Sequence, residues 1–111
     1  MMEPLAFDDF LKVDMRVGRI LAAEPLPKAR IPAYKLTIDF GELGVRKSSA
    51  RVTNLYAAGD LPGRQVIAVV NFPPKRIAGF LSEVLVLGLD GEGGVVLLAP
   101  EREVALGQRV F

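Results

Sequence analysis

The stretch "YKLTIDFGELGVRKSSARV", residues 34–52, decides the fold class of this chain. Its first half alternates apolar and polar side chains, which is typical of a β-strand that buries one face. The apolar positions of this strand are Tyr34, Leu36, Ile38 and Phe40. The turn "GELG" follows, so residues 45–52 are expected to return as the second strand of a hairpin.

The segments on either side of this hairpin are also short and apolar. Residues 15–26, "MRVGRILAAEPL", predict a first strand, with Gly18 as the bulge where the strand bends. Residues 25–34 contain three prolines and are expected to form a loop. After the hairpin, residues 53–59 predict a short helix that begins at a Thr or Asn cap and ends at a glycine.

The second half of the chain adds three apolar strands. They are predicted at residues 65–72, 83–89 and 95–100, and the turn "DGEGG" favours a hairpin between the last two. A small closed barrel removes the edges that such strands would otherwise expose. We therefore predict an all-β fold with one or two short helices, a five-stranded oligonucleotide-binding barrel (OB-fold). Another small β-barrel is the alternative.

Composition narrows the chemistry that this chain can perform. It has 111 residues, enough for one domain, and it contains neither cysteine nor histidine. Disulfides, thiolate metal sites and histidine-activated nucleophiles are therefore impossible, and the carboxylates form no compact cluster. We expect no catalytic residue, no metal and no cofactor, and an enzyme is the disfavoured class.

The same composition bears on location. No apolar run approaches the roughly 20 residues that span a bilayer, so membrane insertion is not expected. The start of the chain, "MMEPLAFDDF", is acidic and lacks the pattern of a secretory signal. Together with the lack of cysteine, this predicts a cytoplasmic protein.

The net charge of +1 conceals an uneven distribution. Residues 28–76 carry nine cations and three anions, whereas the two flanks together carry five cations and ten anions. A polyanion responds to local potential, so the central stretch could bind one despite the low net charge. The alternative is that these charges only decorate solvated faces.

The richest candidate site is "NFPPKRIAGFLSEV", residues 71–84. Two prolines end the preceding strand and hold Lys75 and Arg76 clear of the barrel, and Gly79 turns the chain back. The predicted binding residues are Lys47, Ser49, Arg51, Asn71, Lys75, Arg76, Ser82 and Glu83. Simpler interpretations are that Glu83 pairs with Lys75 or Arg76 at the surface, that Asn71 caps or bridges a strand end, and that the serines of residues 48–49 face solvent.

Several motifs together resemble the tRNA-binding-domain family, and within it the branch of bacterial protein-export chaperones. They are "DMRVGRI", the loop with Lys28-Ala29, "YKLTIDFG", "SSARVTNLY", "VIAVVNFPPKRIAGFLSEVLVLG" and "VVLLAP". The resemblance runs from Phe7 to the end of the chain. Ser49-Ala50 replaces a Ser-Gly of the tRNA-binding members, and Ser82-Glu83-Val84-Leu85 replaces their Ser-Glu-Gly-Met, a pattern that marks the export-chaperone branch.

The resemblance implies a homodimer that binds the folded body of tRNA without strong sequence choice. It also implies that the protein holds unfolded precursor polypeptides and acts with the export machinery. Residues 1–13 and 100–111 are too short to fold alone, yet they carry the apolar residues Phe7, Phe10, Leu11, Val104, Leu106, Val110 and Phe111. We expect these extensions of a single domain, residues 1–111, to mediate dimerisation. The alternative function is a tRNA-binding module with no chaperone role.

Overall fold

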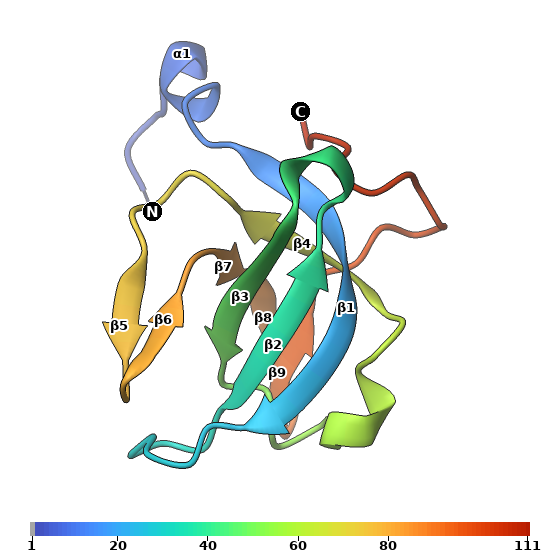
Figure 1. The fold of residues 1–111 in the computed structure, drawn as a ribbon. Coiled ribbons are helices and arrows are strands. Elements are labelled where there is room, and N and C mark those ends of the chain that lie inside the picture. The colour runs from blue at the N-terminus through green and yellow to red at the C-terminus, as the bar shows by residue number, and fades with distance from the viewer. Residues whose placement is uncertain (1) are drawn as a thin grey trace.

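The computed structural model describes residues 2–111 and shows a five-stranded, nearly closed barrel (Figure 1). The strand order is β3-β2-β1-β4-β7. These strands are β1 (Met15–Pro25), β2 (Tyr34–Asp39), β3 (Val45–Ala50), β4 (Gln65–Val69) and β7 (Leu85–Val86). Two hairpins lie outside this sheet. One pairs β5 (Lys75–Ile77) with β6 (Phe80–Ser82), between β4 and β7 in the chain, and the other pairs β8 (Gly88–Gly91) with β9 (Gly94–Leu97), after β7. The helical elements are α1 (Phe7–Phe10), η1 (Gly41–Leu43) and η2 (Ala58–Asp60).

The predicted hairpin of residues 34–52 is confirmed. Strands β2 and β3 pair antiparallel, and the four alternating apolar residues of the first strand are all buried in the core. Phe40, Leu36 and Ile38 are fully buried, together with Ile20 of β1 and Val66 of β4. The β-prediction succeeds here because one face of the strand lines the barrel interior.

Gly18 has a different role from the one predicted. The bulge in β1 lies between Ile20 and Ala22, where the register with β2 shifts. A Cβ atom at Gly18 would lie 2.5 Å from Cγ2 of Ile38 and 2.7 Å from Cε1 of Phe40. The glycine is therefore required by the close approach of two core side chains, and not by a bend of the strand.

The helix predicted at residues 53–59 is wrong. The segment forms turns and only the three-residue 3₁₀-helix η2. A segment this short is marginal as an isolated helix, and here it is anchored at its ends by the buried side chains of Val52 and Leu61. The predicted strand 83–89 is also divided. Leu87 donates its N–H to the carbonyl of Ile67 and accepts from Leu98, so the chain changes its pairing partner from β4 to β9 between β7 and β8.

The carboxy-terminal tail runs along β1. Gly107 donates to the carbonyl of Val17, Val17 donates to that of Gln108, and Val110 donates to that of Met15, at 2.8–3.0 Å. Arg19 donates to both carboxylate oxygens of Glu103, at 2.9 and 2.7 Å, and this lowers the pKa of Glu103. The tail is thus a paired element, whereas α1 stands away from the barrel (Figure 1). Across residues 2–111, no helix has the length and apolarity needed to cross a bilayer.

Candidate functional site

The connection between β4 and β7 is a small hairpin. Ile77 of β5 lies opposite Phe80 of β6, and the two residues between them, Ala78 and Gly79, have φ angles of 51° and 79°. Positive φ at both central positions is the requirement of a type I′ turn, which matches the twist of a two-residue hairpin. The sequence predicts only the turn at Gly79, because Lys75 and Arg76, which precede Ile77, interrupt the apolar pattern that is typical of a strand.

Ser82 and Glu83 fasten this hairpin to the barrel. The N–H of Ser49 donates to Oγ of Ser82 at 3.0 Å. The N–H of Glu83 donates to the carbonyl of Lys47 at 2.8 Å, and the N–H of Lys47 donates to Oε1 of Glu83 at 3.0 Å. Side chains therefore complete the contact between β3 and the end of β6. The predicted surface pairing of Glu83 with Lys75 or Arg76 is wrong because its carboxylate binds the backbone of β3 instead.

Two other polar residues are also structural. Ser48 is fully buried, and its hydroxyl donates to the carbonyl of Val84 at 3.0 Å, so the expectation that it faces solvent is wrong. Asn71 accepts from the N–H of Asp14 at 3.0 Å and donates to the carbonyl of Lys12 at 2.7 Å. It thus bridges the end of β4 to the segment before β1, as one of the simpler interpretations held.

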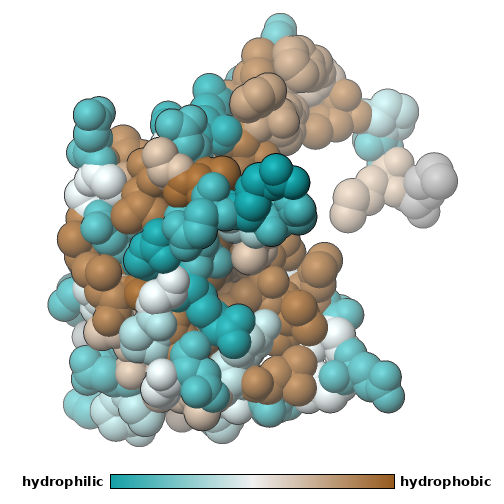
Figure 2. Space-filling model, turned by 90° about the vertical axis from the view of Figure 1, so that its right-hand side faces the viewer, coloured by the Kyte–Doolittle hydropathy of each residue, from teal (hydrophilic) through white to brown (hydrophobic). Residues whose placement is uncertain are grey.

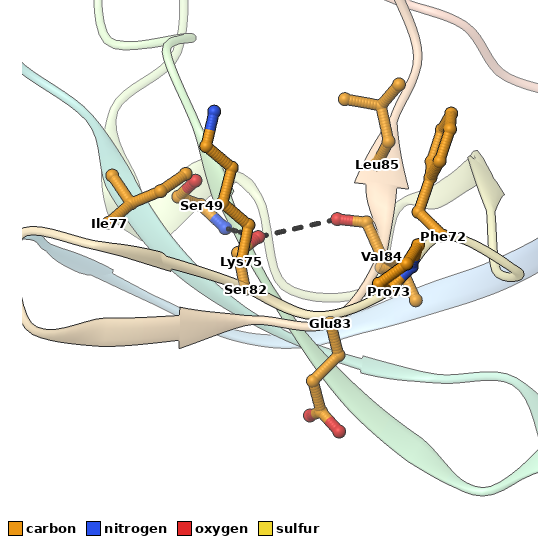
Figure 3. Close-up of a pocket in the computed structure, with 9 residues that line it drawn as sticks. All are labelled: Ser49, Phe72, Pro73, Lys75, Ile77, Ser82, Glu83, Val84 and Leu85. Atoms are coloured by element: carbon orange, nitrogen blue, oxygen red, sulfur yellow. Dashed lines mark hydrogen bonds between the residues drawn. The ribbon is translucent and has the colours of Figure 1, made fainter.

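A hollow of about 420 Å³ lies between the β5–β6 hairpin, Ser49 of β3 and the start of β7, and we call it the apolar pocket. Its lining residues are Ser49, Phe72, Pro73, Lys75, Ile77, Ser82, Glu83, Val84 and Leu85. Figure 3 shows the side chains of Lys75, Phe72 and Leu85 on one side of the chain, whereas that of Glu83 points to the opposite side. The pocket therefore combines aliphatic and aromatic walls with a single cationic side chain at its mouth.

A second hollow of about 620 Å³ lies beside the first, and we call it the basic hollow. Its lining residues are Lys28, Ala29, Arg30, Ile31, Ala33, Ser49, Arg51, Ile77 and Ala78. Ser49 and Ile77 line both hollows, so the two share a wall. Lys28 and Arg30 were not among the predicted site residues, although both contribute to the central charge excess that the sequence showed.

The ion pairs are distributed as unevenly as the charges. Each of the five cations in the flanks lies within 4.0 Å of a carboxylate, as in the pair of Lys12 with Asp9. In residues 28–76, Lys35 alone has such a partner among the residues described, Glu24. The cations of this stretch without one are Lys28, Arg30, Arg46, Lys47, Arg51, Arg64, Lys75 and Arg76. Most of them are exposed, so their charge is available to an external anion.

The structure separates the predicted site residues into groups. Lys47, Ser49 and Arg51 occupy alternate positions along β3 and its end, and therefore share its outward face. Ser49, Lys75, Ser82 and Glu83 line the apolar pocket, and Arg51 joins Ser49 in the basic hollow. Neither hollow is lined by Lys47, Asn71 or Arg76. Arg76 is nevertheless exposed on the β5–β6 hairpin, whose residues line both hollows.

Residues 15–109, which include the barrel and both hollows, match the family of the tRNA binding domain. The chain belongs to the tRNA-binding-domain family. Two solved structures of this fold are similar over nearly the whole chain. The chaperone CsaA of Bacillus anthracis shares 52% identity with a TM-score of 0.92, covering 98% of this chain and 100% of that one. The CsaA chaperone protein of Picrophilus torridus shares 45% identity with a TM-score of 0.91, covering 97% and 100%.

Relatives of another kind carry the tRNA-binding domain as one part of a larger protein. The methionine–tRNA ligase of Porphyromonas gingivalis is 39% identical over 109 residues. The match covers 97% of this chain and 16% of the ligase, so this chain corresponds to a small part of that enzyme. The likeness is therefore to the tRNA-binding domain alone.

Proposed function

We propose that this protein is a homodimeric chaperone that binds both tRNA and unfolded polypeptides, with no catalytic activity of its own. The observation that carries the proposal is the adjacency of the basic hollow and the apolar pocket, which share Ser49 and Ile77. One hollow offers charge and the other offers apolar surface. RNA and unfolded polypeptide respectively need these two kinds of surface.

The RNA-binding role is supported by the family and by the free cations. Lys28, Arg30 and Arg51 line one hollow without an ion pair among the residues described, and Lys75 lines the other. The aromatic side chains of Tyr34 and Phe40 are buried and unavailable for base stacking, and the exposed Phe72 lines the apolar pocket and not the basic hollow. We therefore propose recognition of RNA shape and backbone, which is strongly salt-dependent and nearly independent of sequence.

The polypeptide-holding role is supported by the apolar pocket and by the similarity to CsaA chaperones. Two of the departures from the tRNA-binding pattern of the family, Val84 and Leu85, lie in the wall of this pocket. Leu85 is 49% exposed there, so its side chain adds apolar surface at the mouth. Such a surface suits the aliphatic and aromatic side chains that an unfolded polypeptide exposes.

The assembly that we propose is a dimer formed by the terminal extensions, residues 1–13 and 100–111. Phe7 is 70% exposed, Leu11 is 43% exposed and Phe111 is fully exposed. Figure 2 shows that the amino-terminal segment projects from the body of the protein and is largely hydrophobic. A second copy of the chain would cover these side chains. We place this dimer in the cytoplasm, where precursor polypeptides could pass from it to the export machinery.

Two binding titrations on the purified protein test the function. Labelled bulk tRNA and a labelled polypeptide kept unfolded by reduction and carboxymethylation are each titrated with the protein at low salt. We expect saturable binding of both, with the affinity for tRNA falling steeply as salt is raised. Binding of tRNA alone would leave the alternative function, a tRNA-binding module. Binding of neither would refute the proposal.

A further inference from the structure

The wall between the two hollows has a consequence for how the two ligands bind. We propose that RNA and unfolded polypeptide exclude one another at this site, so that bound RNA controls the release of a held polypeptide. This inference rests on the proposed function, because it requires that each ligand binds on its own. It adds a form of regulation that neither binding activity implies by itself.

The first argument is the thinness of the wall. The apolar pocket and the basic hollow are separated by side chains from two strands, Ser49 of β3 and Ile77 of β5, and both residues are half-buried. A third hollow, of about 290 Å³, is also lined by Ser49 and Ile77, together with Leu85 and Arg51. The three hollows therefore adjoin one another at these residues, and a ligand larger than one hollow must extend into its neighbour.

The second argument is the position of the free cations. Arg51 lines the basic hollow, Lys75 lines the apolar pocket, and Ile77 lines both. A phosphate backbone that contacts Arg51 and Lys75 at once would therefore cross the wall formed by Ser49 and Ile77. In doing so it would cover the mouth of the apolar pocket, where Lys75 and Leu85 point to the same side (Figure 3).

The third argument is size. The chain measures 39 × 34 × 28 Å along its principal axes and has a mass of 12.0 kDa, so a folded tRNA is larger than one subunit. Even an RNA whose contacts were confined to the basic hollow would overhang the neighbouring pocket. An unfolded polypeptide emerging from that pocket carries its chain through the same space. Steric overlap therefore accompanies the competition for Lys75.

Competition fixes the magnitude of the effect. If the complexes are exclusive, tRNA at a free concentration of ten times its dissociation constant raises the apparent dissociation constant of the polypeptide about elevenfold. Thermodynamic linkage requires the effect to be reciprocal. Polypeptide at a free concentration of ten times its own dissociation constant must therefore raise the apparent dissociation constant of tRNA about elevenfold as well. A ternary complex would limit both factors to a plateau.

The test is a competition titration at one fixed ionic strength. The unfolded, carboxymethylated polypeptide carries the label, and its fluorescence anisotropy is followed with protein at several concentrations of unlabelled bulk tRNA. We expect the apparent dissociation constant of the polypeptide to rise in proportion to tRNA, without a plateau. A mixture of polypeptide and tRNA without protein serves as the control for direct association.

A variant locates the effect at the shared site. Lys28→Ala/Arg30→Ala removes two cations from the basic hollow that do not line the apolar pocket. It should bind polypeptide as the unmodified protein does and should require several-fold more tRNA for the same displacement. A plateau in the titration, or a complex that contains both ligands, would overturn the inference while leaving the proposed function intact. Failure of either ligand to bind alone would instead contradict the proposed function.

Discussion

Gly18 shows how much a single atom matters in the core of this barrel. An added Cβ would lie 2.5 Å from the side chain of Ile38 and 2.7 Å from that of Phe40, and both residues are fully buried. Gly18→Ala should therefore overpack the core and lower the free energy of unfolding by roughly 1–3 kcal/mol. Urea denaturation measures the change.

Gly59→Ala is the matched control for this prediction. Among the described residues, 2–111, no atom would lie within 4 Å of a Cβ at Gly59, and the φ of Gly59 is not positive. This substitution should change the free energy of unfolding by less than about 0.5 kcal/mol. Equal denaturation midpoints for the two variants would contradict the role given to Gly18.

At the scale of elements, the contact between β3 and the end of β6 depends on Ser82. Its hydroxyl is the acceptor for the N–H of Ser49 at 3.0 Å, and the side chain is buried. Ser82→Ala leaves that N–H without its partner and should cost roughly 1–3 kcal/mol. Hydrogen exchange at the amide of Ser49 should accelerate more than exchange in β1.

Ser49→Ala is the control for this contact between β3 and the end of β6. The hydroxyl of Ser49 makes no hydrogen bond with any residue of the described chain, 2–111, and the residue is half-buried. Its removal should change the free energy of unfolding by less than about 0.5 kcal/mol. If both serine variants were equally stable, the hydrogen bond to Ser82 would not be what fastens the hairpin.

The strands that line the core could be predicted from the sequence, and the smaller elements could not. β2 was predictable because one face is buried, so the apolar period is two. β5 and β6 have three residues each and form a separate two-stranded sheet beside β3, so burial imposes no such period on them. Ser82 and Glu83 were identified as important polar residues, but their partners on β3 depend on how the barrel closes.

The basic hollow could not be predicted from the sequence, because it too depends on how the barrel closes. Lys28 and Arg30 lie in the proline-rich loop between β1 and β2, whereas Ala78 lies in the β5–β6 turn. The closure of the barrel brings these two loops to one hollow together with Ser49, and no spacing in the sequence encodes that approach. The charge imbalance of residues 28–76 was visible in advance, but its focus on one hollow required the fold.

At the scale of the whole molecule, the two chain ends are tied together at Asp14. Arg16 Nε donates to Asp14 Oδ1 at 2.6 Å, and Nε of Arg109 lies 3.9 Å from the same oxygen. Arg109 also donates to the carbonyl of Leu11 at 2.8 Å. The exposed apolar residues of both termini are thus presented from neighbouring positions, which suits a single dimer contact.

Light scattering at micromolar concentration tests this assembly. We expect twice the 12.0 kDa mass of one chain. Phe7→Ser/Leu11→Ser should shift the protein toward monomer because it removes apolar side chains from the proposed contact. Leu55→Ser is the control, since Leu55 is 46% exposed in the segment between β3 and η2, at the end of the barrel away from α1 (Figure 1). A monomer mass for the unmodified protein would refute the dimer.

The central claim is that tRNA is bound through the unpaired cations around the basic hollow, and the salt dependence of binding tests it most directly. The dissociation constant for bulk tRNA is measured at several salt concentrations for Lys28→Ala/Arg30→Ala and for the control Lys12→Ala/Arg102→Ala. Lys12 and Arg102 are exposed, ion-paired cations outside both hollows. The first variant should bind tRNA more weakly and reduce the logarithmic salt slope by roughly one for each phosphate that the protein no longer neutralises, while the control keeps the slope of the unmodified protein. Equal slopes for all three proteins would contradict the claim.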